Sequence, residues 1–416
     1  MRTTSSSSTG SAARLPTAFN RLAWSNLAAQ SAEQIGLAAA PIVAVLALGA
    51  GAGETGLLQT AQTLPFLLLS IPAGILADRV SRRGLMASAE GLRVASLVAI
   101  LALAQFHLLT LPLLALLGAI GAAGTVAYSV TAPALVPALV PREALAAANG
   151  RMELARSAAF AAGPALGGAL VGWTGPVVAF GVAAALSTWA VVTLRGLRVP
   201  ARSGPPPRRL LHGLREGAVL VFGHPLLRPI LLTAVFFNTS FFVLQAVYVP
   251  YAIHHLGLSA SGVGFTLAAY GFGMIAAALA AMPIARAVAF GTIITLGPVT
   301  GLAAALVMVL TIWIPSPWLA GLCFFLIGAG PMLWVISTTT LRQAVTPGHA
   351  LGRVSAIMVT ATSGSRPVGA AIGALVGAAY GADTCIVVAA LGFLVQAALI
   401  LTSPIPHLAR QPDVVG

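Results

Sequence analysis

A single carboxylate, Glu33, interrupts an otherwise apolar stretch that covers residues 20–48. Asn26 and Gln30 precede it at helical spacing and Gln34 follows it directly, so a helix would gather these side chains on one polar face. Because apolar surroundings disfavour an ionised carboxylate, Glu33 could take up and release a proton as its access to water changes. A structural ion pair, or a position near an aqueous end of the helix, would account for it equally well.

Arg366 is the second charged residue that lies deep inside an apolar stretch, here residues 354–379. Ionisable side chains in such stretches are costly to bury, so each is a candidate functional residue. Arg366 could pair with Glu33, bind an anionic substrate, or donate to helix carbonyl groups. A structural pairing is the favoured interpretation.

The composition is that of a membrane protein. The chain has 416 residues, of which 58% are hydrophobic and 7% are charged, and its mean hydropathy of +0.96 excludes a soluble globular domain. The net charge of +13 comes from 22 basic residues, all arginine, that gather between apolar runs, which favours membrane topology over nucleic-acid binding. Cys323 and Cys385 lie in separate apolar stretches, so no metal site, cofactor or disulfide framework is predicted.

Twelve apolar stretches are long enough to cross a hydrocarbon core of about 30 Å as helices. They cover approximately residues 20–48, 57–77, 85–106, 110–137, 150–172, 176–195, 228–253, 261–283, 290–313, 317–341, 354–379 and 384–402. This pattern predicts an all-α membrane protein with twelve transmembrane helices in two pseudo-symmetric six-helix bundles. A weak internal repeat supports the division, since the Gly-Ala-Leu-Val-Gly of residues 168–172 recurs at residues 373–377.

The arginines also predict the orientation of the chain. They fall at helix ends and connections on one side, and the opposite connections contain none, so both termini are expected in the cytoplasm. The predicted division is a disordered tail at 1–19, bundles at 20–195 and 228–403, a linker at 196–227, and a second tail at 404–416. An amphipathic stretch near Leu210 to Phe222 is expected to lie on the inner membrane face, and a bland spacer is an equal alternative.

The densest cluster of charge separates the second and third apolar stretches. It reads Gly-Ile-Leu-Ala-Asp-Arg-Val-Ser-Arg-Arg-Gly, and a short hinge is expected there because arginine cannot cheaply enter hydrocarbon. The segment resembles the loop between helices 2 and 3 of the major facilitator superfamily, with Ser81 where glycine is usual. The matching positions are Gly74, Leu76, Asp78, Arg79, Arg82 and Arg83, and Gly84 closes the segment. The resemblance implies that this segment steadies one conformation of a transporter and does not bind substrate.

A second motif lies in the fifth apolar stretch. It resembles the antiporter motif of proton-coupled exporters in the same superfamily, with Ala159 replacing one glycine. The matching positions are Gly150, Gly163, Pro164, Gly167 and Gly168. Small residues at this spacing permit close helix packing and the proline favours a bend, although generic packing in a chain with 44 glycines is the alternative.

Several further charged residues lie near the inner ends of the predicted helices. From the packing that the resemblance implies, Asp78 is expected to reach Arg353 or the start of the eleventh helix. Ion-pair networks that hold the inner side closed are expected among Glu90, Arg93, Glu153 and Arg156.

The resemblance implies that helices 1, 4, 7 and 10 line a central cavity. The expected substrate contacts are Asn26, Gln30, Tyr128, Asn238, Phe241, Gln245, Tyr248, Trp334 and Arg366. Their mixture of amide and aromatic groups suits a large amphipathic molecule, although each residue could instead serve packing.

The region from Gly56 through Arg93 resembles the drug:proton antiporter subfamily that includes macrolide and enterobactin exporters. Arginine as the only basic residue besides histidine, together with the high alanine, glycine and leucine content, indicates a bacterium and hence its inner membrane. The resemblance implies a monomer that exports a drug, a macrolide or a siderophore-like molecule by proton-coupled alternating access, with Glu33 as the proton carrier. A lipid or lysolipid flippase of the same fold is the alternative. A membrane enzyme ranks lowest, because the seven histidines are scattered over connections and form no catalytic cluster.

Overall fold

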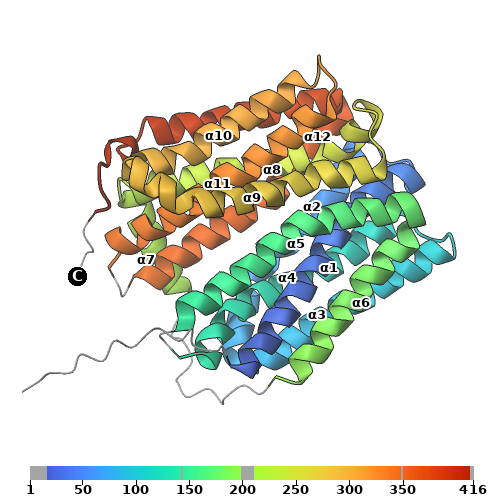
Figure 1. Cartoon of the computed structure of the whole chain (residues 1–416), viewed down its shortest axis with the longest axis horizontal. Helices are drawn as coiled ribbons and strands as arrows, with labels where there is room; N and C mark the ends of the chain where they lie inside the picture. The colour runs from blue at the N-terminus through green and yellow to red at the C-terminus, as the bar shows by residue number, and fades with distance from the viewer. Residues whose placement is uncertain (1–15, 142–143, 198–209, 348–349, 413–416) are drawn as a thin grey trace, which may run out of the picture.

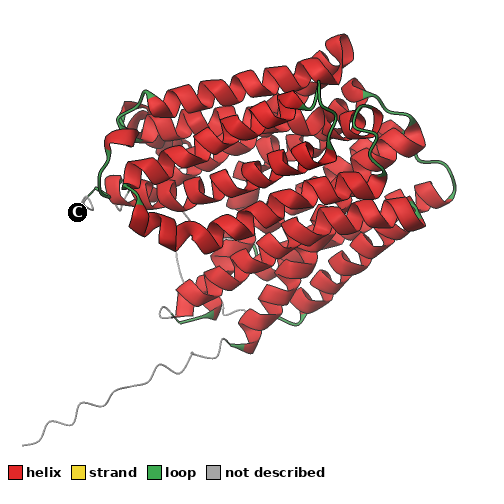
Figure 2. Ribbon diagram, turned by 45° about the horizontal axis from the view of Figure 1, so that its top comes forward, coloured by secondary structure: helices red, strands yellow, loops and turns green. Residues whose placement is uncertain are grey.

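The computed structural model describes residues 16–141, 144–197, 210–347 and 350–412. Within these ranges the regular structure is helical throughout (Figure 2). Eleven of the described helices are long and apolar enough to cross a membrane. The prediction of an all-α membrane protein is confirmed.

The first six helices form one bundle, coloured blue to green in Figure 1. They are α1 (Thr17–Leu48), α2 (Ala52–Arg79), α3 (Arg82–Gln105), α4 (Leu111–Leu139), α5 (Leu145–Thr174) and α6 (Pro176–Arg195). Helix α1 packs against α5 and α6, and α3 packs against α4 and α6. Fully buried Ile35 of α1 and Phe180 of α6 belong to the apolar core that these contacts enclose.

The second bundle, coloured yellow to red in Figure 1, contains the remaining long helices. They are α8 (Leu227–His254), α9 (Ala260–Ala287), α10 (Phe290–Leu310), α11 (Pro317–Val345) and α12 (Leu351–Leu401), followed by the short η2 (Ile405–His407). Helix α8 packs along α12, and α11 packs against α9 and α10.

Helix α12 contains two membrane crossings. It has 51 residues, and a straight helix of that length would extend about 75 Å, more than twice the thickness of a hydrocarbon core. At Gly381 the backbone leaves the helical region, with φ 82° and ψ 176°, a conformation that glycine adopts without strain. Eleven apolar helices therefore supply the twelve crossings that the sequence predicts.

Several helices begin earlier than predicted, among them α1 and α2. Helix α1 begins at Thr17 and not at residue 20, and residues 1–15 lie outside the described part of the chain. Helix α2 begins at Ala52 and not at residue 57, because the Glu54 carboxylate accepts a hydrogen bond of 2.8 Å from the Gly51 backbone N–H. This cap satisfies a terminal donor and allows the helix to start one turn before its apolar stretch.

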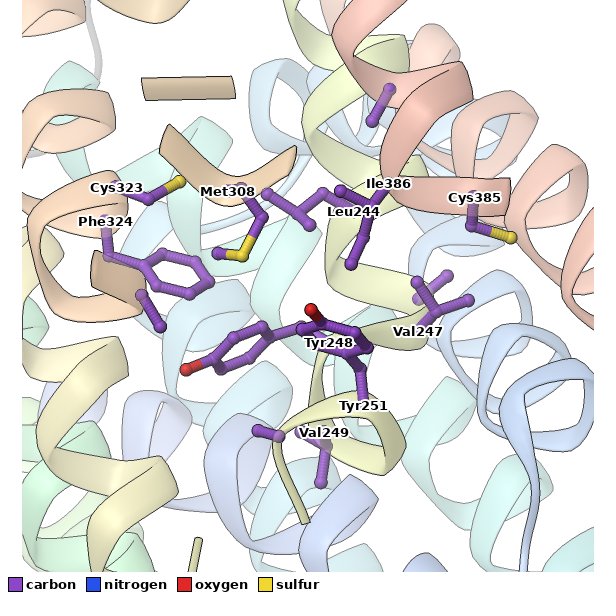
Figure 3. Packing of buried hydrophobic residues seen from close by; sticks show 14 of the residues in the cluster. Leu244, Val247, Tyr248, Val249, Tyr251, Met308, Cys323, Phe324, Cys385 and Ile386 are labelled. Atoms are coloured by element: carbon purple, nitrogen blue, oxygen red, sulfur yellow. The ribbon is translucent and has the colours of Figure 1, made fainter. Parts of the chain in front are cut away.

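The core of the second bundle surrounds α8 (Figure 3). Tyr248 lies edge-on to Phe324 with ring centroids 4.5 Å apart, and its hydroxyl donates to Thr266 Oγ1 at 2.5 Å. Tyr251 pairs its hydroxyl with that of Thr311 at 2.8 Å. Each buried phenol thus has a polar partner, as the low dielectric of the interior requires.

The two bundles meet along two helix pairs, α2 with α12 and α5 with α9. Glycine permits the close approach: a Cβ on Gly56 would lie 2.5 Å from the Ala374 Cα, and one on Gly168 would lie 2.4 Å from the Ala260 carbonyl oxygen. Gly56 lies near the beginning of α2 and Gly168 near the end of α5, so both contacts lie at the end of the bundles that the chain reaches after crossing once along α1. The bundles are therefore locked together at the end opposite the chain termini.

The amphipathic stretch of the linker forms helix α7 (Leu210–Gly223), which packs against α12 and α8 of the second bundle. Glu216 forms an ion pair with Arg353 at the start of α12, and both side chains are 46% exposed. An exposed pair of this kind contributes little, about 0–1 kcal/mol. The side chain of Asp78, which was expected to reach Arg353, lies outside the described part of the chain.

Candidate functional site

A central cavity lies between the two bundles. Its volume is about 320 Å³, and its wall combines residues of α1–α6 with residues of α8, α9, α11 and α12. A second cavity of about 430 Å³ shares part of that wall, namely Arg156, Phe237, Asn238, Tyr270 and Arg366. This second cavity continues along α11 to Trp334, Thr338 and Arg342, which places it toward the end of the bundles that carries the chain termini.

Glu33 lies on the wall of the central cavity and belongs to a buried ion network. Its carboxylate is 3.8 Å from the Arg93 guanidinium, and Arg93 pairs more closely with Glu90 at 2.8 Å. The exposed fractions are 17% for Glu33, 5% for Arg93 and 0% for Glu90. Arg93 also donates to the Ala29 carbonyl oxygen at 3.0 Å and to Thr125 Oγ1 at 2.5 Å. Arg93 is therefore held by the bundle, and Glu33 is its loosest and most accessible partner.

Glu153 and Arg156 form the other predicted ion pair, on successive turns of α5. The Arg156 Nε donates to both carboxylate oxygens at 3.0 and 3.1 Å, and the guanidinium lies 5.4 Å from the centre of the Phe160 ring. This pair and the Glu90–Arg93 pair each lie within the first bundle. In this conformation neither pair joins the two bundles, and a role in holding the inner side closed stays a prediction.

Arg366 lies on the cavity wall between aromatic rings of both bundles. Its guanidinium carbon is 5.1 Å from the ring centre of Phe66 on α2 and 5.7 Å from that of Phe242 on α8. Its Nε has no hydrogen-bond partner, and among the described residues it forms no ion pair with Glu33 or another carboxylate. Cation–π contact therefore takes the place of the expected structural pairing.

Aromatic rings line much of the remaining wall. Tyr270 of α9 lies 5.8 Å from Phe160 of α5 and 5.7 Å from Phe241 of α8, measured between ring centres, and Phe237 stacks on Phe241 at 5.9 Å. These rings bring both bundles into one apolar surface. Sequence reasoning identified only Phe241 among them. Phe160 and Tyr270 were missed because α5 and α9 were not expected to line the cavity, and Phe237 was missed although it lies on α8.

The wall also contains polar side chains of α2 that sequence reasoning missed. Gln59, Gln62 and Phe66 face the cavity and follow the spacing of a single helix face. That spacing was the available signal, although it lies within an otherwise apolar stretch. The Oε1 of Gln62 is buried without a hydrogen-bond partner.

The predicted cavity residues divide into two groups. Asn238, Phe241, Gln245 and Arg366 line the central cavity, and Trp334 lines the second one. Four other candidates line neither cavity: Asn26, Gln30, Tyr128 and Tyr248.

Three of these four turn back into their own bundles, which corrects the expectation for them. Tyr248 donates to Thr266, the Tyr128 hydroxyl lies 3.4 Å from that of Ser25, and Asn26 donates to the Met152 carbonyl oxygen at 3.5 Å. Residues on neighbouring turns of one helix face can thus differ, one lining the cavity and the next packing inside its own bundle. The spacing in the sequence does not tell these two positions apart.

The antiporter motif mediates close packing of α5 on two sides. A Cβ on Gly163 would lie 2.4 Å from the Gln34 Cβ, and one on Gly167 would lie 2.9 Å from the Ile35 carbonyl oxygen, both on α1. Gly168 faces α9 across the bundle interface, where the Pro164 carbonyl oxygen also approaches Gly264. Gly150 has open space around it, so packing does not explain this position.

The charged segment forms a two-residue hinge between α2, which ends at Arg79, and α3, which begins at Arg82. Ser81, which occupies the usual glycine position, caps α3 by accepting a hydrogen bond of 3.3 Å from the Gly84 N–H. Arg83 donates to the Leu197 carbonyl oxygen at 3.1 Å and ties the hinge to the end of α6. A Cβ added to Gly74 of α2 would lie 3.9 Å from the Val130 side chain of α4, which is an ordinary contact distance. Helices α2 and α4 are therefore not tightly opposed at this position.

Replacement of Arg93 by methionine is expected to destabilise the protein by about 3–5 kcal/mol, because Glu90 would be left as an unpaired buried carboxylate. The measurement is the free energy of unfolding in detergent. Adding Glu90→Gln to the same chain removes the orphaned charge and is expected to restore most of the loss. Equal stability of Arg93→Met and the native protein would contradict the network.

The known proteins that resemble this chain are membrane transporters, in agreement with a cavity between two helical bundles. Residues 22–370 match the model of the Major Facilitator Superfamily. The chain is similar to an uncharacterised MFS-type transporter, y4rN, of Sinorhizobium fredii, with 29% identity over 77% of this chain and 79% of the relative. It is also similar to the multidrug efflux pump Tap of Mycobacterium tuberculosis, with 23% identity over 83% of this chain and 84% of the relative.

Solved transporter structures share the fold. A bacterial homologue of the iron transporter ferroportin has a TM-score of 0.73 in its inward-facing state, with 15% identity over 92% of this chain and 98% of that one. The same homologue in its outward-facing state has a TM-score of 0.64, with coverage of 93% and 99%. A bacterial homologue of the lysosomal transporter Spinster, inward-facing, has a TM-score of 0.69 with 15% identity over 95% and 98%. The chain therefore belongs to the Major Facilitator Superfamily and is a membrane transporter, not an enzyme.

Proposed function

We propose that this transporter exports a bulky amphipathic small molecule by proton-coupled alternating access, and that Glu33 carries the proton. The observation that carries the proposal is the position of Glu33: it faces an aromatic-lined cavity and shares Arg93 with Glu90. The similarity to the multidrug efflux pump Tap supports export of drug-like, macrolide-like or siderophore-like molecules.

The ion network allows Glu33 to change its protonation state at low cost. Arg93 keeps Glu90, Ala29 and Thr125 as partners when Glu33 is neutral, so protonation leaves no arginine unpaired. A cationic group of the substrate near Glu33 favours the ionised carboxylate and expels the proton. Substrate and proton thereby compete for one site, which is the requirement of an antiporter.

The direction of access follows from the bundle contacts. The α2–α12 and α5–α9 contacts close one end of the cavity, while the second cavity continues toward the end with the chain termini. We place both termini in the cytoplasm, because arginines gather on the terminal side. We also propose a monomer in a bacterial inner membrane, and the similarity to bacterial transporters supports the bacterial location. The conformation is then inward-open, ready to receive a cytoplasmic substrate.

Replacement of Asp78 by asparagine is expected to slow transport strongly while leaving the affinity for substrate unchanged. The reason is that Asp78 belongs to the charged segment at the end of α2, which we propose acts on the exchange between conformations, whereas the α2 residues of the cavity wall lie between Gln59 and Phe66. Transport rates in proteoliposomes and equilibrium binding in detergent, measured on the same preparation, separate the two effects. Weakened binding with a normal rate of conformational exchange would contradict the gating role.

The proposed function is tested with proteoliposomes in which a pH gradient is imposed. Dyes, macrolides and catecholate siderophores are expected to accumulate against their concentration gradients, and a protonophore should abolish the accumulation. Transport that is indifferent to the pH gradient would contradict proton coupling. Movement of labelled lysolipid between leaflets, with no transport of the soluble compounds, would support the flippase in its place.

A further inference from the structure

Charged groups at the central cavity are paired unequally. Arg93 is compensated by Glu90 at 2.8 Å, and Arg156 is compensated by Glu153 through two hydrogen bonds of 3.0 and 3.1 Å. Two charged side chains of the wall remain without a close ionic partner. One is Glu33, whose contact with Arg93 is 3.8 Å, and the other is Arg366.

The two remaining charges have opposite sign and come from opposite bundles. Glu33 belongs to α1 and Arg366 to α12, and both line the same 320 Å³ cavity without forming an ion pair with each other. The wall of the same cavity also carries the aromatic rings of Phe237, Phe241 and Tyr270. A ligand that reaches both charges must therefore carry two polar groups on an aromatic or apolar body.

The Arg366 guanidinium is prepared to bind an anion. It lies over the rings of Phe66 and Phe242, and its Nε is buried without a hydrogen-bond partner. A planar guanidinium with free donors recognises a carboxylate by two parallel hydrogen bonds. Because Phe66 and Phe242 belong to different bundles, an anion bound here would contact the interface that moves during transport.

We propose that the substrate is a zwitterion: an aromatic or apolar body with a cationic group that binds at Glu33 and an anionic group that binds at Arg366. This inference rests on the proposed function and names its substrate class. A zwitterion compensates both charges, whereas a simple cation leaves Arg366 unpaired in the cavity and a simple anion leaves Glu33 unpaired. Its cationic group also expels the proton from Glu33, as antiport requires.

Three congeners of one ring system test the proposal. Norfloxacin carries an ammonium and a carboxylate at neutral pH, its ethyl ester keeps only the cation, and its N-acetyl derivative keeps only the anion. Dissociation constants for the purified protein are expected to favour norfloxacin by about tenfold or more over each congener, the ratio that one charge-assisted hydrogen bond supplies.

Variants of Arg366 assign the preference to its side chain. In Arg366→Gln we expect norfloxacin and its ester to bind equally, with proton release on binding retained for both. Arg366→Lys keeps the positive charge and should keep a preference for the zwitterion, which excludes a general loss of folding as the cause. Arg286→Gln, an exposed arginine at the end of α9, is the matched control and should leave the native ratio unchanged.

The outcomes separate this inference from the proposed function. Equal binding of the three congeners to the native protein, or binding of none, would overturn the zwitterion and leave proton-coupled export of other compounds standing. A zwitterion preference that depends on Arg366, with no proton released by any congener, would support the inference and overturn the proton coupling.

Discussion

The Glu33→Gln variant is expected to lose pH-gradient-driven accumulation entirely, down to the level of protein-free liposomes. Glutamine has nearly the same shape as glutamate and can keep its amide oxygen at the place of the carboxylate oxygen that lies 3.8 Å from Arg93, but it cannot exchange a proton. Exchange of labelled for unlabelled substrate at equal pH should continue, because that reaction needs only the movement of the loaded transporter. Transport with and without a pH gradient, measured on one preparation, reveals the difference.

The matched control for this experiment is Glu54→Gln. Glu54 is also a glutamate of the first bundle, but it caps α2 at the opposite end from the charged hinge and does not line the cavity. Its amide replacement keeps the acceptor of the cap, so gradient-driven accumulation should remain. If Glu33→Gln accumulates substrate as the native protein does, Glu33 is not the proton carrier.

The Gly168→Leu variant is expected to abolish transport by a different route. A Cβ at this position would already lie 2.4 Å from the Ala260 carbonyl oxygen and 2.7 Å from the Gly264 Cα, so leucine acts as a wedge between α5 and α9. Overpacking of this kind costs about 1–3 kcal/mol, which shifts a two-state equilibrium by roughly 5–150-fold. The shift should favour the state in which these helix ends are apart.

Spin labels attached at positions Trp173 and Leu258, on either side of this contact, measure the distance between the ends of α5 and α9 directly. The distance distribution in Gly168→Leu should move to longer values than in the native background, with Cys323 and Cys385 replaced by alanine in both. Gly91→Leu is the control, because a Cβ on Gly91 meets no atom within 4 Å. An unchanged distribution in Gly168→Leu, together with normal transport, would show that the α5–α9 contact does not act as a gate.

The fold could be predicted well from the sequence, for a simple physical reason. Apolar stretches of sufficient length must form helices in a bilayer, where every backbone N–H and C=O needs an internal partner. The same rule explains the remaining differences at helix ends, which depend on local hydrogen bonds such as the Glu54 cap of α2. Helix α12 holds two of the predicted crossings, with a non-helical backbone at Gly381 between them.

The site could be predicted only in part. Glu33 and Arg366 stood out because charge is rare in apolar stretches, and both do line the central cavity. Their partners could not be predicted, since Arg93 and Phe66 approach from other helices at distances set by the packing of the whole bundle. For the same reason, Tyr248 had the spacing of a cavity residue but turned into the core of its own bundle.

The glycine motif was also predictable only in part: close packing could be predicted, and the partner helices could not. Spacing predicted that α5 would present a smooth surface, and Gly163 and Gly168 do permit close contacts. The sequence did not indicate that these two glycines face different helices, α1 and α9. That difference matters for function, because only the Gly168 contact joins the two bundles.

Competition between substrate and proton in the central cavity is the main claim, and proton release on ligand binding tests it most directly. The purified protein is placed in weakly buffered solution with a pH indicator, and a dye, macrolide, siderophore or fluoroquinolone ligand is added. We predict proton release by the native protein and by Glu54→Gln, and none by Glu33→Gln at saturating ligand. Ligand binding without release by the native protein, or the same release from Glu33→Gln, would contradict the account.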